Sequence, residues 1–236
     1  MTREATLSQG ASGALPELSS LAPISKETVQ DRVYASLRAA IMRGEVKPGQ
    51  NLTIPGLAAA FGTSAMPVRQ ALFRLAAERA LMIVSGRTVG VPPLSRSRLR
   101  DLTRVRLEVE GLAAAWAAEA RTASLIDELT VLVDQMWQYL EAEDAGGFLN
   151  RNQAFHFAVY RSSGSLTLIP IIESLWLQIG PYLNLLHRSG NYQAANEHHE
   201  ALKEALARGD GAGARSALEG DIRKAADLLL TLVTRD

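Results

Sequence analysis

The 236-residue sequence contains no cysteine. This absence excludes disulfide scaffolds, thiolate zinc sites, iron–sulfur clusters and cysteine nucleophiles, so any metal site must use His, Asp, Glu or Asn ligands. The sequence also lacks a continuous apolar run of the about 18 residues that a transmembrane helix requires. Its N-terminal residues lack the apolar core of a secretory signal peptide, and we therefore expect a cytoplasmic protein without a membrane partner.

The sequence has no formal net charge, because 25 Lys and Arg residues balance 25 Asp and Glu residues. Two parts of the chain nevertheless carry opposite net charges. Residues 1–94 carry ten basic and six acidic side chains, a charge of +4, whereas residues 95–236 carry fifteen and nineteen, a charge of −4. The total argues against a protein that is basic throughout, but the basic first part is compatible with a DNA-binding module.

Composition divides the chain into three segments. Residues 1–25 are rich in Ser, Ala, Gly and Pro, which is typical of a mobile N-terminal arm. Residues 26–94 and residues 95–236 are the two predicted domains. They are joined at a short linker, because Pro92 and Pro93 can continue neither a helix nor a central strand.

The apolar spacing of the first predicted domain is typical of three helices, over residues 28–42, 54–61 and 64–79. In the second helix, Leu57, Ala58 and Phe61 are expected to face inward. Ser64 is a suitable cap for the third helix. Two short apolar runs on either side of residues 85–88 predict a β-hairpin. Two short helices joined by a Gly-containing turn and followed by a hairpin form a winged helix-turn-helix.

This layout predicts DNA binding through the third helix and the hairpin tip. Ser64, Met66, Arg69 and Arg74 point away from the apolar stripe, and the helix N terminus offers unpaired N–H groups to phosphate. Arg69 lies in the first turns, where an arginine can bind guanine through two hydrogen bonds. Arg87 at the hairpin tip could reach a phosphate or the minor groove. The alternative is a small helical domain with solvated arginines.

Two spaced patterns run through this domain, Leu37-Arg38-x-x-Ile41-x-x-Gly44-x-x-x-Pro48-Gly49-x-x-Leu52 and Ser64-x-x-Pro67-Val68-Arg69-x-Ala71-Leu72-x-x-Leu75. Residues 28–94 therefore resemble the GntR family of bacterial transcription regulators. The resemblance implies that operator DNA is contacted by Arg38, Ser64, Arg69 and the tip residues Ser85 and Gly86. Ala65 stands where the family usually has an arginine, so the operator sequence does not carry over from relatives.

Six helical segments make up the second predicted domain, over residues 95–121, 124–143, 145–162, 165–187, 190–208 and 210–234. Short connections between helices of this length predict an α-helical bundle. The predicted fold class is thus mainly α, with an N-terminal winged helix-turn-helix domain and a C-terminal six-helix bundle. Aromatic residues at helical spacing are more often core than pocket lining, which applies to Trp137, Tyr139, Tyr160, Trp176 and Tyr182.

Polar residues interrupt the apolar faces of three of these helices. Asn152 and His156 are four positions apart and so share one helix face. His199 lies on an inward stripe, whereas His198 is turned about 100° away. Asp221 also lies on an inward face, where a carboxylate needs a partner. These side chains could close around one divalent cation, or they could be separate hydrogen-bonded core residues.

A second series of motifs consists of Arg106-x-x-x-Glu110, Phe155-His156, His199-x-x-Leu202-x-x-Ala205-Leu206 and Ala217-x-x-x-Asp221. Residues 98–230 resemble the FCD effector domain of the FadR-type subfamily of GntR regulators, in the VanR-like variety with six helices. In that domain an Asp and three His hold a metal. The resemblance places Asn152, His156, His199 and Asp221 in these positions and implies a divalent metal ion, zinc or nickel in the first place.

The same resemblance places Arg106 beside an effector pocket. A guanidinium group matches a carboxylate through two parallel hydrogen bonds, so the implied effector is a small organic acid. The alternative is that Arg106 forms only a helix pair with Glu110.

We therefore expect a homodimeric, ligand-responsive regulator of operator DNA that is not an enzyme. Two alternatives remain open. One is a metal-free sensor in which His156, His199 and Asp221 bind the effector directly. The other is a metal-dependent enzyme with an appended DNA-binding domain. The sequence determines neither the effector and the operator nor whether the protein represses or activates.

Overall fold

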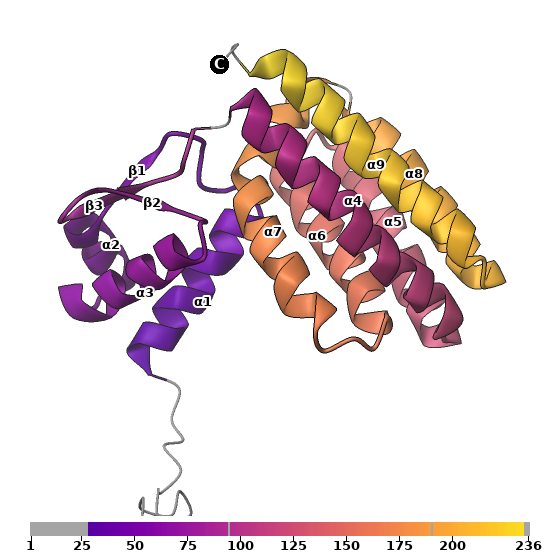
Figure 1. Cartoon of the computed structure of the whole chain (residues 1–236), viewed down its shortest axis with the longest axis horizontal. Helices are drawn as coiled ribbons and strands as arrows, with labels where there is room; N and C mark the ends of the chain where they lie inside the picture. Colours follow the sequence, from indigo (N-terminus) through magenta and orange to yellow (C-terminus); the bar gives the residue numbers. More distant parts are fainter. Residues whose placement is uncertain (1–27, 94, 190, 234–236) are drawn as a thin grey trace, which may run out of the picture.

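The computed structural model describes residues 28–93, 95–189 and 191–233. The described chain consists of an N-terminal part with a small sheet and a C-terminal bundle of long helices (Figure 1). The predicted N-terminal arm, residues 1–25, lies outside the described residues. Within them, no helix combines the length and the apolarity that crossing a bilayer requires.

The N-terminal part contains α1 (Val29–Met42), β1 (Asn51–Thr53), α2 (Ile54–Phe61), α3 (Ala65–Ala77), β2 (Met82–Ser85) and β3 (Thr88–Gly90). Helix α1 begins at a capping box in which Thr28 and Asp31 satisfy each other's backbone N–H groups. Buried aliphatic side chains of α1 and α3 form the core of this part, among them Leu37, Ile41 and Leu72. The three predicted helices are thus present at closely matching positions.

The sheet has three antiparallel strands in the order β1-β3-β2. The predicted hairpin corresponds to β2 and β3. Strand β1 was not predicted, because its three residues are too short to show a periodic pattern. Leu52 at its centre is buried and pairs with Val89 of β3, so β1 is held by tertiary contact rather than by local preference.

Helix α2 faces the core differently from the prediction. The expectation that Phe61 faces inward is wrong, since its side chain is 38% exposed, and Ile54 is the buried residue of this helix. The other two predicted inward residues, Leu57 and Ala58, are half-buried and pack against the core. Ser64 does occupy the N-cap position of α3, but its side chain makes no capping hydrogen bond.

The C-terminal part is built from α4 (Arg96–Glu119), α5 (Ala123–Glu141), α6 (Ala145–Ser162), α7 (Leu168–Leu183), α8 (Asn191–Arg208) and α9 (Gly211–Leu232). Helix α9 packs along both α4 and α8, and α5 packs against α6. The predicted helix over residues 165–187 is shorter in the structure, since a 3-10 turn (Asn184–Ser189) follows α7. Six helices and a winged helix-turn-helix confirm the predicted fold class.

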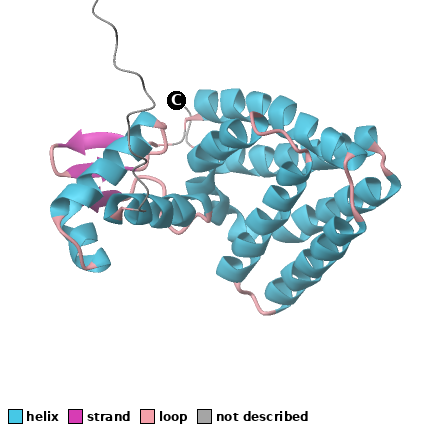
Figure 2. Ribbon diagram, turned by 90° about the horizontal axis from the view of Figure 1, so that it is seen from below, coloured by secondary structure: helices cyan, strands magenta, loops and turns pink. Residues whose placement is uncertain are grey.

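Helix α7 joins the two parts by packing against α1, and Figure 2 shows the sheet and the bundle on opposite sides of this contact. Gly180 lies directly on the backbone of α1. A Cβ atom at Gly180 would stand 2.8 Å from the Cα of Met42 and would collide with the carbonyl oxygen of Ile41. The Tyr182 hydroxyl adds a hydrogen bond to the Pro92 carbonyl. The contact therefore depends on the absence of a side chain at position 180.

Candidate metal centre and DNA-binding face

Seven polar or charged side chains of the described chain are buried within the bundle: Arg106, Glu110, Asn152, His156, Asn196, His199 and Asp221. Burial of such groups is unfavourable unless they are paired or hydrogen-bonded. All of them except Asn152 have partners, and these partners link them into one network. The bundle therefore has a polar centre rather than a purely apolar core.

The metal-ligating side chains of this network converge from three helices, His156 from α6, His199 from α8 and Asp221 from α9. Nε2 of His156 lies 3.2 Å from Nε2 of His199 and 3.3 Å from Oδ2 of Asp221. One ligand atom of each residue lies within 4.8 Å of those of the other two. Two imidazoles and one carboxylate form a set that suits zinc or nickel. Three of the four residues expected to hold a metal are thus brought together.

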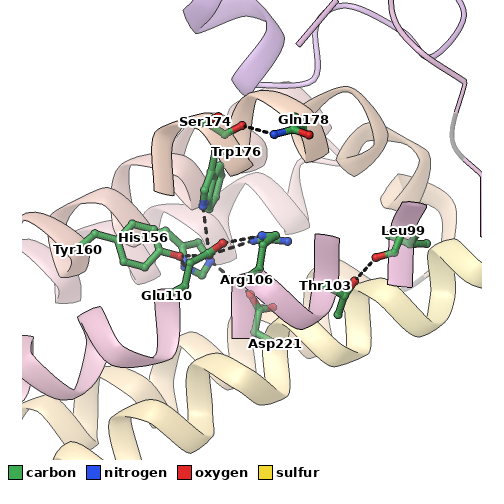
Figure 3. A network of polar contacts seen from close by, with 10 residues as sticks. All are labelled: Leu99, Thr103, Arg106, Glu110, His156, Tyr160, Ser174, Trp176, Gln178 and Asp221. Carbon is green, nitrogen blue, oxygen red and sulfur yellow. Dashed lines mark hydrogen bonds and ion pairs between the residues drawn. The ribbon is translucent and has the colours of Figure 1, made fainter. Parts of the chain in front are cut away.

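The Nδ1 side of His156 is connected to a buried carboxylate through the Tyr160 hydroxyl (Figure 3). The Tyr160 hydroxyl donates to Oε2 of Glu110 at 2.6 Å, which leaves its oxygen free to accept from Nδ1 of His156 at 3.2 Å. Glu110 also accepts from the Trp176 indole at 3.2 Å and forms a two-bond ion pair with Arg106. In the tautomer with the proton on Nδ1, Nε2 of His156 presents its lone pair to the cluster, whereas in the other tautomer Nε2–H donates to Oδ2 of Asp221.

His199 is oriented in the same way by Asn196. The side-chain NH2 group of Asn196 donates to the Val133 carbonyl at 3.4 Å, so its oxygen accepts from Nδ1 of His199 at 3.2 Å. Nε2 of His199 therefore presents a second lone pair to the cluster. Two lone pairs at 3.2 Å repel each other unless a cation or a proton lies between them. The donor set thus fits a divalent cation.

The protonation states of His199 and Asp221 are those that metal binding requires. Burial lowers the pKa of His199 to about 3, although Asp221 acts in the opposite direction, so the imidazole is neutral at pH 7. Burial raises the pKa of Asp221, but its contacts with His156 and His199 outweigh burial and hold this pKa below its usual value. A neutral imidazole and an ionised carboxylate need not lose a proton before they bind a cation.

Asn152, the fourth predicted ligand, lines a small cavity beside the cluster. The cavity has a volume of about 30 Å³, which is room for one or two water molecules. Asp221 also lines it, and the remaining lining is almost entirely apolar. The Asn152 side chain is 9% exposed and has no hydrogen-bond partner within the described chain. Its amide is therefore available to a ligand in the cavity.

Arg106 forms the helix pair with Glu110 that the sequence left as an alternative. Nε and Nη2 of Arg106 contact the two carboxylate oxygens at 2.6 and 3.1 Å, and the Arg106 guanidinium lies 5.6 Å from the centre of the Trp176 ring. Unlike an exposed helix pair, this one is buried, with the Glu110 side chain fully inaccessible. A direct contact between Arg106 and an effector stays a prediction.

The predicted DNA-contacting residues of α3 and the hairpin lie close together. Nη1 of Arg69 donates to the carbonyl of Gly86 at 3.1 Å and so connects α3 to the hairpin tip. Ser64 and Met66 are exposed at the N-terminal end of α3, and the tip residues 85–87 are exposed as well. These positions form one accessible face of the N-terminal part.

Two further arginines that were predicted to contact DNA interact with other side chains of the protein. Nη2 of Arg38 on α1 forms an ion pair with Oε2 of Glu173 on α7 at 2.6 Å. The guanidinium of Arg74 lies 3.7 Å from the centre of the Tyr34 ring and pairs with Glu78 at 3.3 Å. Arg38 therefore bridges the two parts of the chain in this structure.

Sequence reasoning did not find three residues that shape the site. Glu110 was seen only as a helix partner of Arg106, whereas it accepts hydrogen bonds from three side chains. Tyr160 lies four positions after His156, a spacing that puts it on the same helix face. Asn196 lies three positions before His199 in the same way. Both spacings were visible in the sequence and could have identified these two residues.

Family comparisons agree with the architecture. Residues 29–91 match the gntR family of bacterial regulatory proteins, and residues 101–224 match the FCD domain. The HTH-type transcriptional regulator McbR of Escherichia coli is 34% identical over 190 residues, which are 79% of this chain and 86% of McbR. The gluconate operon transcriptional repressor of Bacillus subtilis is 26% identical and covers 78% of this chain and 77% of its own length.

Solved structures share the fold. E. coli McbR/YncC has a TM-score of 0.80 at 31% identity, with 87% of this chain and 98% of that chain covered. A putative GntR regulator from Rhodococcus sp. RHA1 has a TM-score of 0.72 at 22% identity, with 87% and 99% covered. A DNA-binding head joined to an FCD domain defines a transcriptional regulator rather than an enzyme. The chain belongs to the GntR family of bacterial regulators and carries an FCD domain.

Proposed function

We propose that this protein is a homodimeric bacterial repressor that binds operator DNA. Its affinity for the operator is controlled by a small organic acid that binds next to a divalent cation. The observation that carries the proposal is the pair of Nε2 atoms of His156 and His199, which face each other and Asp221 in the FCD domain. Residues 26–94 read the operator in the cytoplasm. Residues 95–236 bind the effector and the second subunit, in the VanR-like arrangement of six helices.

Repression is proposed by similarity, since two of the relatives are named as repressors of the gluconate operon. A dimer is proposed because a palindromic operator presents two half-sites to a protein with two-fold symmetry. The cation is proposed to be held by His156, His199 and Asp221, with Asn152 adjacent, and to supply a positive charge that attracts a carboxylate. The metal-free sensor remains the second candidate, because Asn152 and Asp221 line the cavity without need of a cation.

Operator binding is proposed to use Ser64, Met66, Arg69 and the hairpin tip. Arg69→Ala is expected to weaken operator binding at least tenfold, because an arginine that pairs with guanine contributes about 1–3 kcal/mol of discrimination. The measurement is a gel-shift or fluorescence-anisotropy titration at several salt concentrations. The wild-type log–log salt slope should be about −0.9 for each phosphate contacted.

The control for Arg69→Ala is Arg208→Ala, which removes an exposed arginine at the end of α8. It should leave operator affinity unchanged. If Arg69→Ala binds as tightly as the wild type, or if both variants lose affinity equally, Arg69 is not part of the DNA-reading face.

Arg38 is proposed to connect the effector site to operator binding. Its ion pair with Glu173 spans α1 and α7, and α7 also carries Trp176, whose indole donates to Glu110 next to the metal cluster. A guanidinium that is held by Glu173 is not free to contact a phosphate. A shift of α7 that lengthens the ion pair would therefore release Arg38 to the DNA.

Glu173→Gln is expected to raise operator affinity of the effector-free protein by at least fivefold, within the usual range of about 1–3 kcal/mol for coupling between sites. The matched control is Glu45→Gln, which also removes one negative charge near an arginine, Arg43, but at an ion pair within one part. Combining Glu173→Gln with Arg38→Ala should remove the gain, as a double-mutant cycle requires. A gain that persists without Arg38 would contradict the proposed link.

A further inference from the structure

Two cavities share one pair of aromatic rings in their linings. The inner cavity, of about 30 Å³, adjoins the metal cluster, and a surface pocket of about 430 Å³ lies outside it. Phe148 and Tyr192 line both cavities. Their rings are stacked, with centroids 4.4 Å apart and planes inclined by only 9°. The ring pair therefore borders both the cluster side and the surface pocket.

The inner cavity is too small for an effector in this conformation, whereas the surface pocket lies in the range of about 300–1,000 Å³ that is usual for ligand sites. Displacement of the two rings would join the cavities. The side chain of Tyr192 is anchored by its hydroxyl to the Leu183 carbonyl at 3.2 Å, and Leu183 itself lines the inner cavity. The ring pair is thus bonded directly to the wall that an effector would contact.

The buried charges beside the inner cavity select the charge of its ligand. Arg106 and Glu110 neutralise each other in their ion pair, which leaves the negative charge of Asp221. A divalent cation bound at Asp221 would change the local charge to plus one. A monoanion then neutralises the buried site, whereas a dianion leaves an excess negative charge, and uncompensated buried charge is costly.

The lining of the inner cavity selects the rest of the ligand. Apart from Asn152 and Asp221, its lining side chains are aliphatic or aromatic. Leu183, Leu186 and Ala225 are among the purely aliphatic ones. None of the lining residues is basic, and the nearest buried guanidinium, that of Arg106, is held by Glu110. A polyol chain would lose its hydrogen bonds to water without replacing them, which is unfavourable.

We propose that the effector is a monocarboxylate with a short apolar tail, which binds beside the Phe148–Tyr192 pair, directs its carboxylate to the cation and the Asn152 amide, and packs its tail against Leu183, Leu186 and Ala225. The proposal rests on the proposed function in that a cation occupies the cluster. Two relatives are named as repressors of the gluconate operon, and gluconate therefore serves below as the polyol comparison.

Calorimetric titration of the zinc-loaded full-length protein tests the ligand class with three acids. Isovalerate is a branched monoanion, gluconate is a polyol monoanion and succinate is a dianion. Isovalerate is expected to bind at least tenfold more tightly than gluconate or succinate. Gluconate or succinate binding as tightly as isovalerate would overturn the proposal.

A matched pair of variants on α7 tests the position of the tail. Leu183→Ala enlarges the inner cavity, whereas Leu177→Ala removes the same atoms from a buried leucine of the same helix that does not line it. Leu183→Ala should shift the ratio of octanoate to isovalerate affinity at least fivefold toward octanoate, and Leu177→Ala should leave the ratio unchanged. Equal ratios in the two variants would overturn the proposed location of the tail.

Zinc content and operator binding are measured on the same samples, so that a failure of the proposed effector class can be distinguished from a failure of the proposed metal-assisted function. Protein that holds zinc and binds operator but shows no preference for isovalerate would overturn the effector class alone. Protein that holds no zinc would overturn the proposed metal-assisted function and, with it, this assignment of the carboxylate.

Discussion

His156→Ala is expected to abolish retention of a divalent cation by protein purified without a histidine tag. His156 supplies one of only three ligand atoms that lie within 4.8 Å of each other among the described residues. Two remaining ligands, His199 and Asp221, cannot by themselves form the three- or four-ligand set that is typical of protein zinc sites. Metal content per chain, measured by elemental analysis after dialysis, should fall from near one to near zero.

The control for this experiment is His198→Ala. His198 is a direct neighbour of His199, but it faces Gly220 of α9, and its ring lies outside the ligand cluster. This variant loses an imidazole without losing a ligand and should retain the cation. Wild-type metal content in His156→Ala, or equal loss in both variants, would remove the cluster from the mechanism and favour the metal-free sensor.

Glu110→Ala is expected to lower the free energy of unfolding by about 3–5 kcal/mol, the usual cost of breaking a buried ion pair by removing one partner. The loss leaves the Arg106 guanidinium, the Tyr160 hydroxyl and the Trp176 indole without their common acceptor. Because the Tyr160 hydroxyl also orients His156, cation affinity should fall by about 10- to 100-fold. Urea denaturation and competitive metal titration measure the two effects.

Glu108→Ala is a matched control on the same helix. Glu108 also pairs with an arginine at 2.6 Å, Arg215, but the Glu108 side chain is 76% exposed. Surface ion pairs contribute only about 0–1 kcal/mol, so this variant should unfold almost like the wild type. Equal destabilisation by the two variants would contradict the assigned role of the buried pair.

The fold could be predicted in large part because its main signals are local. Apolar residues at helical spacing placed the six helices of the bundle, and the turn at residues 85–88 placed the hairpin. Strand β1 and the burial of Ile54 in place of Phe61 were not predicted, since Leu52 and Ile54 are buried by contacts with distant segments. Such contacts leave no periodic pattern in three to eight residues.

The candidate site shows the same division. Spacing alone placed His199 and Asp221 on inward faces, and both are buried next to His156. Spacing could not show that Glu110 would accept three hydrogen bonds, because its partners come from α4, α6 and α7. Likewise, nothing in the local sequence of Arg38 indicates Glu173, which lies 135 positions away on another helix.

The glycine at position 180 determines how motion of the bundle reaches the DNA-reading head. Side chains at an interface can absorb a small displacement by changing rotamer, but here the backbones of α7 and α1 touch with no side chain between them. Gly180 therefore fixes one point of the contact between α7 and α1, and a tilt of α7 about this point changes the separation of residues farther along the two helices, such as Glu173 and Arg38. The glycine thus serves as a pivot for α7, and a larger residue at position 180 would push the two helices apart.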